Sequence, residues 1–76
     1  MARAPLQVRL AKAIRAQREA RGYSQEGFAD HIGVHRTYYG GIELGKQNLT
    51  LRSLERIAEG LEVSVSSLFV TADKSN

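Results

Sequence analysis

Hydrophobic residues recur at intervals of three or four positions along most of this chain, which is the spacing of amphipathic helices. Glycines and residues that commonly cap helices interrupt the pattern and divide it into five segments. The segments expected to be helical span residues 5–21, 24–32, 35–44, 50–61 and 64–70. No stretch alternates apolar and polar residues for long enough to indicate a strand, so we expect an all-α fold.

The apolar positions within these segments identify the expected core. In the first and fourth segments they form a stripe along one whole helix face. The second and third segments add a few residues each, including the small Ala29, which lets two helices cross closely. The expected core residues are Leu6, Leu10, Ala13, Ile14, Phe28, Ala29, Ile32, Tyr39, Ile42, Leu51, Leu54, Ile57, Ala58 and Leu61. A chain of 76 residues makes only a small core, which leaves room for an additional stabiliser such as a partner subunit.

The segment from Ser24 to Gly45 has the form of two short helices joined by a tight turn. Ser24 is a favourable N-cap, and Gly33 tolerates the positive φ angle that such a turn requires. This arrangement is typical of a helix-turn-helix, whose second helix enters the major groove of DNA. Gly40 and Gly41 lie inside that second helix, where each costs about 1 kcal/mol relative to alanine. Either neighbouring packing tolerates this cost, or the backbone approaches DNA or another helix closely.

Basic residues concentrate in the N-terminal part of the chain. Residues 1–48 hold eight Lys or Arg against four Asp or Glu, for a charge of +4, whereas residues 49–76 hold three against four, for −1. The basic part contains the helix-turn-helix pattern and suits a polyanionic partner such as double-stranded DNA. The alternative is an ordinary solvated basic face.

Several function classes lack the residues that they need. The chain has no cysteine, and His31 and His35 have no third candidate ligand nearby, so we expect no metal site and no cofactor. The sequence offers no apolar carboxylate pair, no nucleophile beside a base and no phosphate-binding glycine loop, so we expect no catalytic residue and no enzymatic activity. It shows no signal peptide, and its longest strongly apolar run is Leu68–Val70, so we expect a cytoplasmic protein without membrane contact.

Several short motifs occur in the order and at the spacing of one known family. They are Arg18, GYSQ at 22–25, Ala29, GVHRTY at 33–38, IELGK at 42–46 and NLTLRSLERIAEGLEVSVSSLF at 48–69. In these residues the chain resembles the Cro/C1-type (XRE) helix-turn-helix family of bacterial and phage regulators. The HRTY and NLTLRSLE stretches are most similar to the small controller proteins of restriction–modification systems. The resemblance implies a compact five-helix, lambda-repressor-like DNA-binding domain.

The resemblance also implies which residues contact DNA bases. His35, Arg36 and Thr37 match positions at the start of the recognition helix, which we expect over residues 35–44. Arg36 is the strongest candidate, because a guanidinium can pair with both O6 and N7 of guanine. Gly41 stands where many members carry a longer polar side chain, so a base contact there is either absent or made by the backbone.

Other matched positions imply contacts to the DNA backbone or a structural role. Arg18 and Glu43 match a pair that commonly links the first helix to the third. Phosphate contacts, which fix the register without reading sequence, are implied at Gln25, Tyr38, Lys46, Gln47 and Asn48. For Tyr38, partial burial over a neighbouring side chain is an equally open alternative. Gln47 stands where arginine is frequent in the family, so the contact to the phosphate is expected to be weaker here.

We expect one domain over residues 1–76, with an ordered core at about 5–70 and a flexible tail at 71–76. Some residues of the C-terminal apolar cluster close the core, and the surplus would form a two-fold dimer interface. The cluster consists of Val63, Val65, Leu68, Phe69 and Val70. Two recognition helices about 34 Å apart would read a palindrome with much higher affinity than one.

These observations predict a sequence-specific transcriptional regulator that acts as a homodimer on a palindromic operator. It would act either as a repressor, by occluding a promoter, or through contact with RNA polymerase, and the sequence leaves activation and repression both open. An autoregulating controller of a restriction–modification operon is one form of this function. The alternative is an antitoxin-like or other protein-interaction module that uses the same fold.

Overall fold

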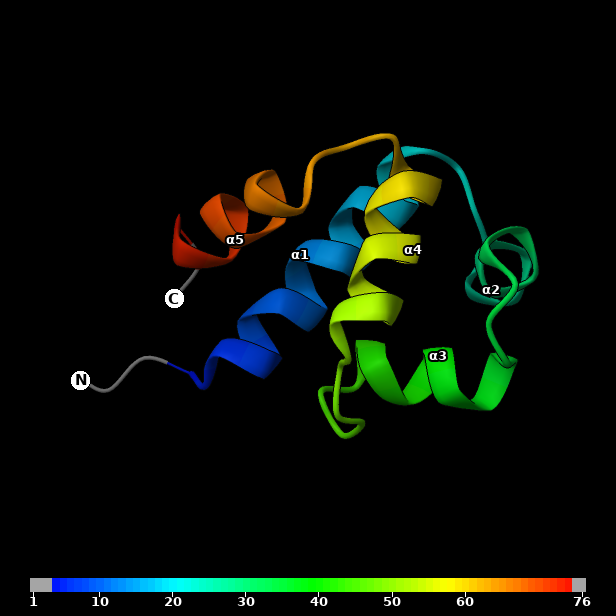
Figure 1. Cartoon of the computed structure of the whole chain (residues 1–76), viewed down its shortest axis with the longest axis horizontal. Coiled ribbons are helices and arrows are strands. Elements are labelled where there is room, and N and C mark those ends of the chain that lie inside the picture. Colours follow the sequence, from blue (N-terminus) through cyan, green and yellow to red (C-terminus); the bar gives the residue numbers. More distant parts are fainter. Residues whose placement is uncertain (1–3, 75–76) are drawn as a thin grey trace.

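Helices form all the regular secondary structure of residues 4–74, the part of the chain that the computed structural model describes (Figure 1). They are α1 (Leu6–Ala20), α2 (Gln25–Ile32), α3 (Arg36–Glu43), α4 (Leu51–Leu61) and α5 (Val65–Lys74). No strand occurs within residues 4–74, and the expected all-α class is confirmed. None of these helices is long and apolar enough to cross a membrane.

Side-chain hydroxyls cap the starts of α2 and α4. The hydroxyl oxygens of Ser24 and Thr50 accept hydrogen bonds from the backbone N–H groups of Gly27 (2.9 Å) and Ser53 (3.0 Å). The backbone of Gly33 has a φ of 72°, the left-handed conformation that commonly ends a helix. Local sequence therefore sets the limits of α2 and the start of α4.

A single hydrophobic core lies between the helices. α1 packs against α3, α4 and α5, and in Figure 1 it lies between α4 and α5, while α2 packs against α3 and α4. The rings of Phe28 and Tyr39 meet edge to face with 5.4 Å between centroids, which joins α2 to α3. The buried residues of this core are Leu10, Ala13, Ile14, Phe28, Ala29, Tyr39, Ile42, Leu54, Ile57, Ala58, Leu61, Leu68 and Ala72.

Two residues of the predicted stripes do not belong to this core. Leu51 is 82% exposed and Leu6 is 42% exposed. Each is the first residue of its helix, and a helical side chain leans toward the N-terminus, so both side chains extend beyond the packed face. With Phe69 they line a shallow, mainly apolar groove that involves α1, α4 and α5.

The chain stays helical further than the sequence indicated. Residues 71–74, expected in a flexible tail, continue α5, and Ala72 is fully buried. Asp73 forms an ion pair with Arg9 of α1 at 3.1 Å. Packing of α5 along α1 orders residues whose local composition is polar, because tertiary contacts outweigh local propensity. Residues 75 and 76, the rest of the predicted tail, lie outside the described residues.

The C-terminal apolar cluster divides into core and surface. Leu68 is 1% exposed and packs in the core of its own chain, so its assignment to a dimer interface is wrong. Val63, Val65 and Phe69 are partly buried against that core, whereas Val70 is 53% exposed. The surplus apolar surface of this cluster is therefore smaller than the sequence suggested.

Candidate nucleic-acid interface

The turn between α2 and α3 fixes how the two helices meet. The N–H of Val34 donates to the carbonyl of Ala29 (3.0 Å), and Val34 packs against the core. His35 then caps α3, because its Nδ1 accepts a hydrogen bond from the N–H of Thr37 (3.3 Å). In the view of Figure 1, α3 lies at one edge of the molecule. This is the geometry of a helix-turn-helix with an accessible second helix.

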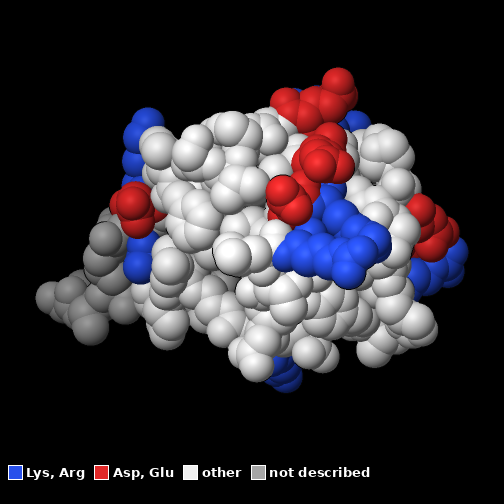
Figure 2. All heavy atoms as spheres, in the orientation of Figure 1, with Lys and Arg blue, Asp and Glu red and all other residues white. Residues whose placement is uncertain are grey.

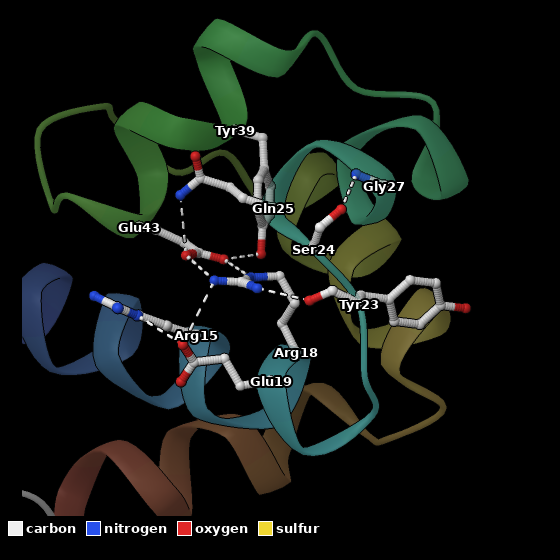
Figure 3. A network of polar contacts seen from close by, with 9 residues as sticks. All are labelled: Arg15, Arg18, Glu19, Tyr23, Ser24, Gln25, Gly27, Tyr39 and Glu43. Carbon is white, nitrogen blue, oxygen red and sulfur yellow. Dashed lines mark hydrogen bonds and ion pairs between the residues drawn. The ribbon is translucent and has the colours of Figure 1, made fainter.

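The end of α3 is tied to α1 by a buried ion pair (Figure 3). Arg18 donates from Nε and Nη2 to the two carboxylate oxygens of Glu43, at 2.7 and 3.0 Å. Its Nη1 donates to the carbonyl of Tyr23 at 2.7 Å. The two charged side chains are only 9% and 3% exposed. The structure thus brings together the pair that the resemblance implied.

Glu43 is the centre of a wider network. It also accepts hydrogen bonds from the hydroxyl of Tyr39 and from Nε2 of Gln25, the latter at 3.2 Å. Burial would raise the pKa of Glu43, but the hydrogen bonds from Arg18, Tyr39 and Gln25 outweigh it and the pKa is lowered. The pKa of Tyr39 is raised, mainly by burial and to a smaller extent by its hydrogen bond to Glu43. A charged Glu43 therefore holds α1, α2 and α3 in one arrangement.

A shallow hollow runs along the outer side of α3. Six of the residues that the sequence assigned to DNA contact line it, namely Gln25, Arg36, Thr37, Gly41, Lys46 and Gln47. They come from the start of α2, from α3 and from the loop after α3, so the fold gathers them on one surface. Glu26, Gly40 and Leu44 complete the lining. We call this surface the recognition hollow.

The other predicted contact residues lie outside the recognition hollow. Tyr38 is half-buried, and its hydroxyl donates to the carbonyl of Asn48 (3.1 Å) and hydrogen-bonds Ser53 (3.2 Å). It therefore holds the loop after α3 against α4, which favours the structural alternative for this residue. His35 and Asn48 are exposed near the two ends of α3.

Gly41 allows a side chain of the following loop to lie on α3. A Cβ atom at this position would lie 2.3 Å from Cγ of Gln47, a distance that real structures do not tolerate. At Gly40 the nearest atom to such a Cβ is Oε1 of Gln25 at 3.4 Å, an ordinary contact. The close approach at Gly41 is thus made by the loop, not by a neighbouring helix.

Arg36 is engaged by two carboxylates of α2. Its Nε and Nη2 donate to Asp30 at 3.2 and 2.8 Å, and its Nη1 donates to Glu26 at 2.8 Å. The hydrogen bond to Asp30 raises the pKa of Arg36, and the hydrogen bond from Arg36 lowers the pKa of Asp30. Both shifts favour the charged forms of Arg36 and Asp30.

Positive charge does not form one continuous patch on the face of the molecule that Figure 2 shows. On the face shown in Figure 2, Lys and Arg side chains lie beside Asp and Glu side chains, and most of the surface carries neither. Several arginines of the basic N-terminal part have acidic partners, including Arg9 with Asp73 and Arg21 with Glu62. The excess of basic residues in the sequence therefore overstates the positive field at the surface.

Comparison with known proteins identifies the fold family. A family model described as helix-turn-helix matches residues 14–68. The chain belongs to the helix-turn-helix family. It is 45% identical over 58 residues to the control protein C.MunI of a Mycoplasma species, over 76% of this chain and 78% of that protein. It is 37% identical over 67 residues to the control protein C.SmaI of Serratia marcescens, over 88% and 80% of the two chains. Among solved structures, the wild-type restriction–modification controller protein C.Esp1396I is similar with a TM-score of 0.84 and 38% identity, over 95% of each chain.

Sequence reasoning missed three residues of this helix-turn-helix. Leu44 is 69% exposed and lines the recognition hollow, although it lies off the apolar stripe of α3. Neither Glu26 nor Asp30 was predicted to contact Arg36. Their spacing of four residues, which places both on one face of α2, was the available signal.

Proposed function

We propose that this chain is a homodimeric, sequence-specific transcriptional regulator that inserts α3 into the major groove of DNA. The observation that carries the proposal is the recognition hollow, where six predicted contact residues meet along the second helix of a helix-turn-helix. The similarity of the whole chain to control proteins supports it. Such a role requires neither a catalytic step nor a cofactor.

The residues of the hollow divide by what they would contact. Arg36 reads guanine through O6 and N7, and Thr37 hydrogen-bonds a base or touches a thymine methyl group. Gln25 at the start of α2 and Lys46 and Gln47 in the loop contact phosphates on either side. At Gly41 the DNA meets backbone and the side chain of Gln47. We add Leu44, whose exposed methyl groups suit a sugar or a thymine methyl.

Dimerisation uses the apolar surface that the core leaves uncovered. Leu6, Leu51 and Phe69 line one groove, and Val70 is exposed on the same helix as Phe69. A related structure is described as the tetramer of C.Esp1396I in complex with its natural 35 base-pair operator, with a TM-score of 0.83 to this chain. By analogy, two copies of this chain bind a palindrome, with recognition helices about 34 Å apart.

The biological role is control of a restriction–modification operon, including the gene of the regulator itself. The dimer acts in the cytoplasm, where binding occludes a promoter or brings the protein into contact with RNA polymerase. Since affinity for the operator is coupled to dimerisation, protein concentration sets the degree of regulation.

Binding to the DNA upstream of its own gene tests this function. We expect the purified protein to bind one such fragment far more tightly than bulk competitor DNA at physiological salt. Equal binding to all fragments would contradict the proposal. If an untagged neighbouring protein co-purified instead, the chain would be a protein-interaction module.

A further inference from the structure

The guanidinium of Arg36 is hydrogen-bonded to other side chains of the protein. Three of its N–H groups donate to Asp30 and Glu26, two of them to the two oxygens of one carboxylate. The contact lies on the surface, since the side chains of Arg36, Asp30 and Glu26 are 55%, 57% and 71% exposed. We call these two carboxylates the Arg36 clamp.

The clamp changes what a DNA strand meets at this point of the recognition hollow. One positive and two negative charges lie together, so the local field does not attract a phosphate. A phosphate that bound Arg36 would have to displace both carboxylates and would then lie beside them as a third negative group. That arrangement is unfavourable, because like charges at close range repel.

We propose that Glu26 and Asp30 are specificity-determining residues. Their hydrogen bonds prevent Arg36 from binding phosphates but allow it to bind guanine. This inference rests on the proposed function. The O6 and N7 atoms of guanine are a pair of neutral acceptors and can replace the two oxygens of Asp30 without adding a full negative charge. Nonspecific binding depends almost entirely on phosphates. The clamp therefore weakens nonspecific binding more than operator binding.

The variant Glu26→Gln/Asp30→Asn removes the clamp while keeping side-chain shape. Its matched control is Glu59→Gln/Glu62→Gln, which changes the net charge by the same amount. Both carboxylates are exposed and lie outside the helix-turn-helix, and Glu62 is likewise paired with an arginine, Arg21. For each variant, the affinity for a nonspecific duplex and for the operator obtained by selection from random DNA is measured over a range of salt concentrations. Circular dichroism checks that all variants are folded.

We expect nonspecific binding of the clamp variant to gain one phosphate contact per protomer. Its salt slope should steepen by about 0.9 per protomer beyond that of the charge control. The ratio of operator to nonspecific affinity should fall several-fold. Adding Arg36→Ala to the clamp variant should remove this gain, because no other residue gives it.

Three outcomes would overturn the inference. Nonspecific binding of the clamp variant could match the charge control, or its gain could survive Arg36→Ala. The clamp variant could instead lose operator affinity with no nonspecific gain, which would mean that Asp30 holds Arg36 in position for DNA. A wild-type protein with no sequence preference would refute the proposed function itself, whereas the first three outcomes leave it standing.

Discussion

The carboxylate of Glu43 receives two hydrogen bonds from the guanidinium of Arg18, and this pair joins the last residue of α3 to α1. Both side chains are nearly excluded from water. Gln25 of α2 donates to the same carboxylate, so a single charged group contacts all three helices that place the recognition hollow. The orientation of α3 toward DNA therefore depends on a polar contact as well as on the apolar core.

Replacement of Glu43 by glutamine should destabilise the protein strongly. The change leaves the buried charge of Arg18 with only the more distant carboxylate of Glu19, at 4.0 Å, and loss of one partner of a buried ion pair typically costs about 3 kcal/mol of unfolding free energy. Urea denaturation of the wild type and the variant measures the difference. Glu62→Gln breaks the exposed pair with Arg21 and should cost less than about 1 kcal/mol. Equal effects of the two variants would refute the special role of the buried pair.

The stability of the wild type should fall at acid pH more steeply than that of Glu43→Gln. The pKa of Glu43 is lowered below its ordinary value of 4.5 in the folded state. Such a group contributes stability that is complete above its unfolded pKa and is lost as the pH falls through its folded pKa. The additional loss should therefore appear below about pH 4.5. Denaturation midpoints measured between about pH 3 and pH 7 test this, and parallel curves for the two proteins would contradict it.

Gly41→Ala should weaken DNA binding by displacing Gln47. The added Cβ would meet Cγ of Gln47 at 2.3 Å, so that side chain must leave its place over α3. Loss of one uncharged hydrogen bond to a phosphate should lower the affinity for all DNA sequences about equally and leave the salt slope nearly unchanged, because Gln47 neutralises no phosphate. Gln47→Ala should have the same effect, and the double variant should lose no more than either single one. Additive losses would mean that Gly41 acts independently of Gln47.

Leu51→Glu should separate the dimer without unfolding the chain. Leu51 is 82% exposed, so the substitution removes nothing from the core, but a charge in the apolar groove opposes association. Sedimentation should show a monomer whose thermal melting no longer depends on protein concentration. Leu44→Glu places the same charge in the recognition hollow and should remain dimeric while losing DNA affinity. A dimeric Leu51→Glu protein would place the interface elsewhere.

Much of the fold followed from local patterns in the sequence. Ser24, Gly33 and Thr50 mark helix limits through their own backbone and side-chain chemistry, and the structure has these limits. The exposure of Leu51 was not predicted, because the pattern does not show where the packed face ends. The helical state of residues 71–74 was missed for a related reason, since it depends on contacts with α1.

The candidate site was predictable as a set of residues but not as a set of contacts. Motif positions pointed to Arg36, and no local rule places its guanidinium on carboxylates of the preceding helix. That contact depends on the angle between α2 and α3, which the turn at Gly33 and the core set together. The same holds for Gly41, whose neighbour Gln47 comes from the loop that folds back.

Selection of bound sequences from random DNA, with wild type and Arg36→Ala side by side, would decide whether α3 reads bases. We expect the wild type to enrich a palindromic motif with a guanine preference in each half-site, and Arg36→Ala to lose that preference. No enriched motif for either protein, with weak and salt-sensitive binding in both, would contradict the assignment of a sequence-specific regulator.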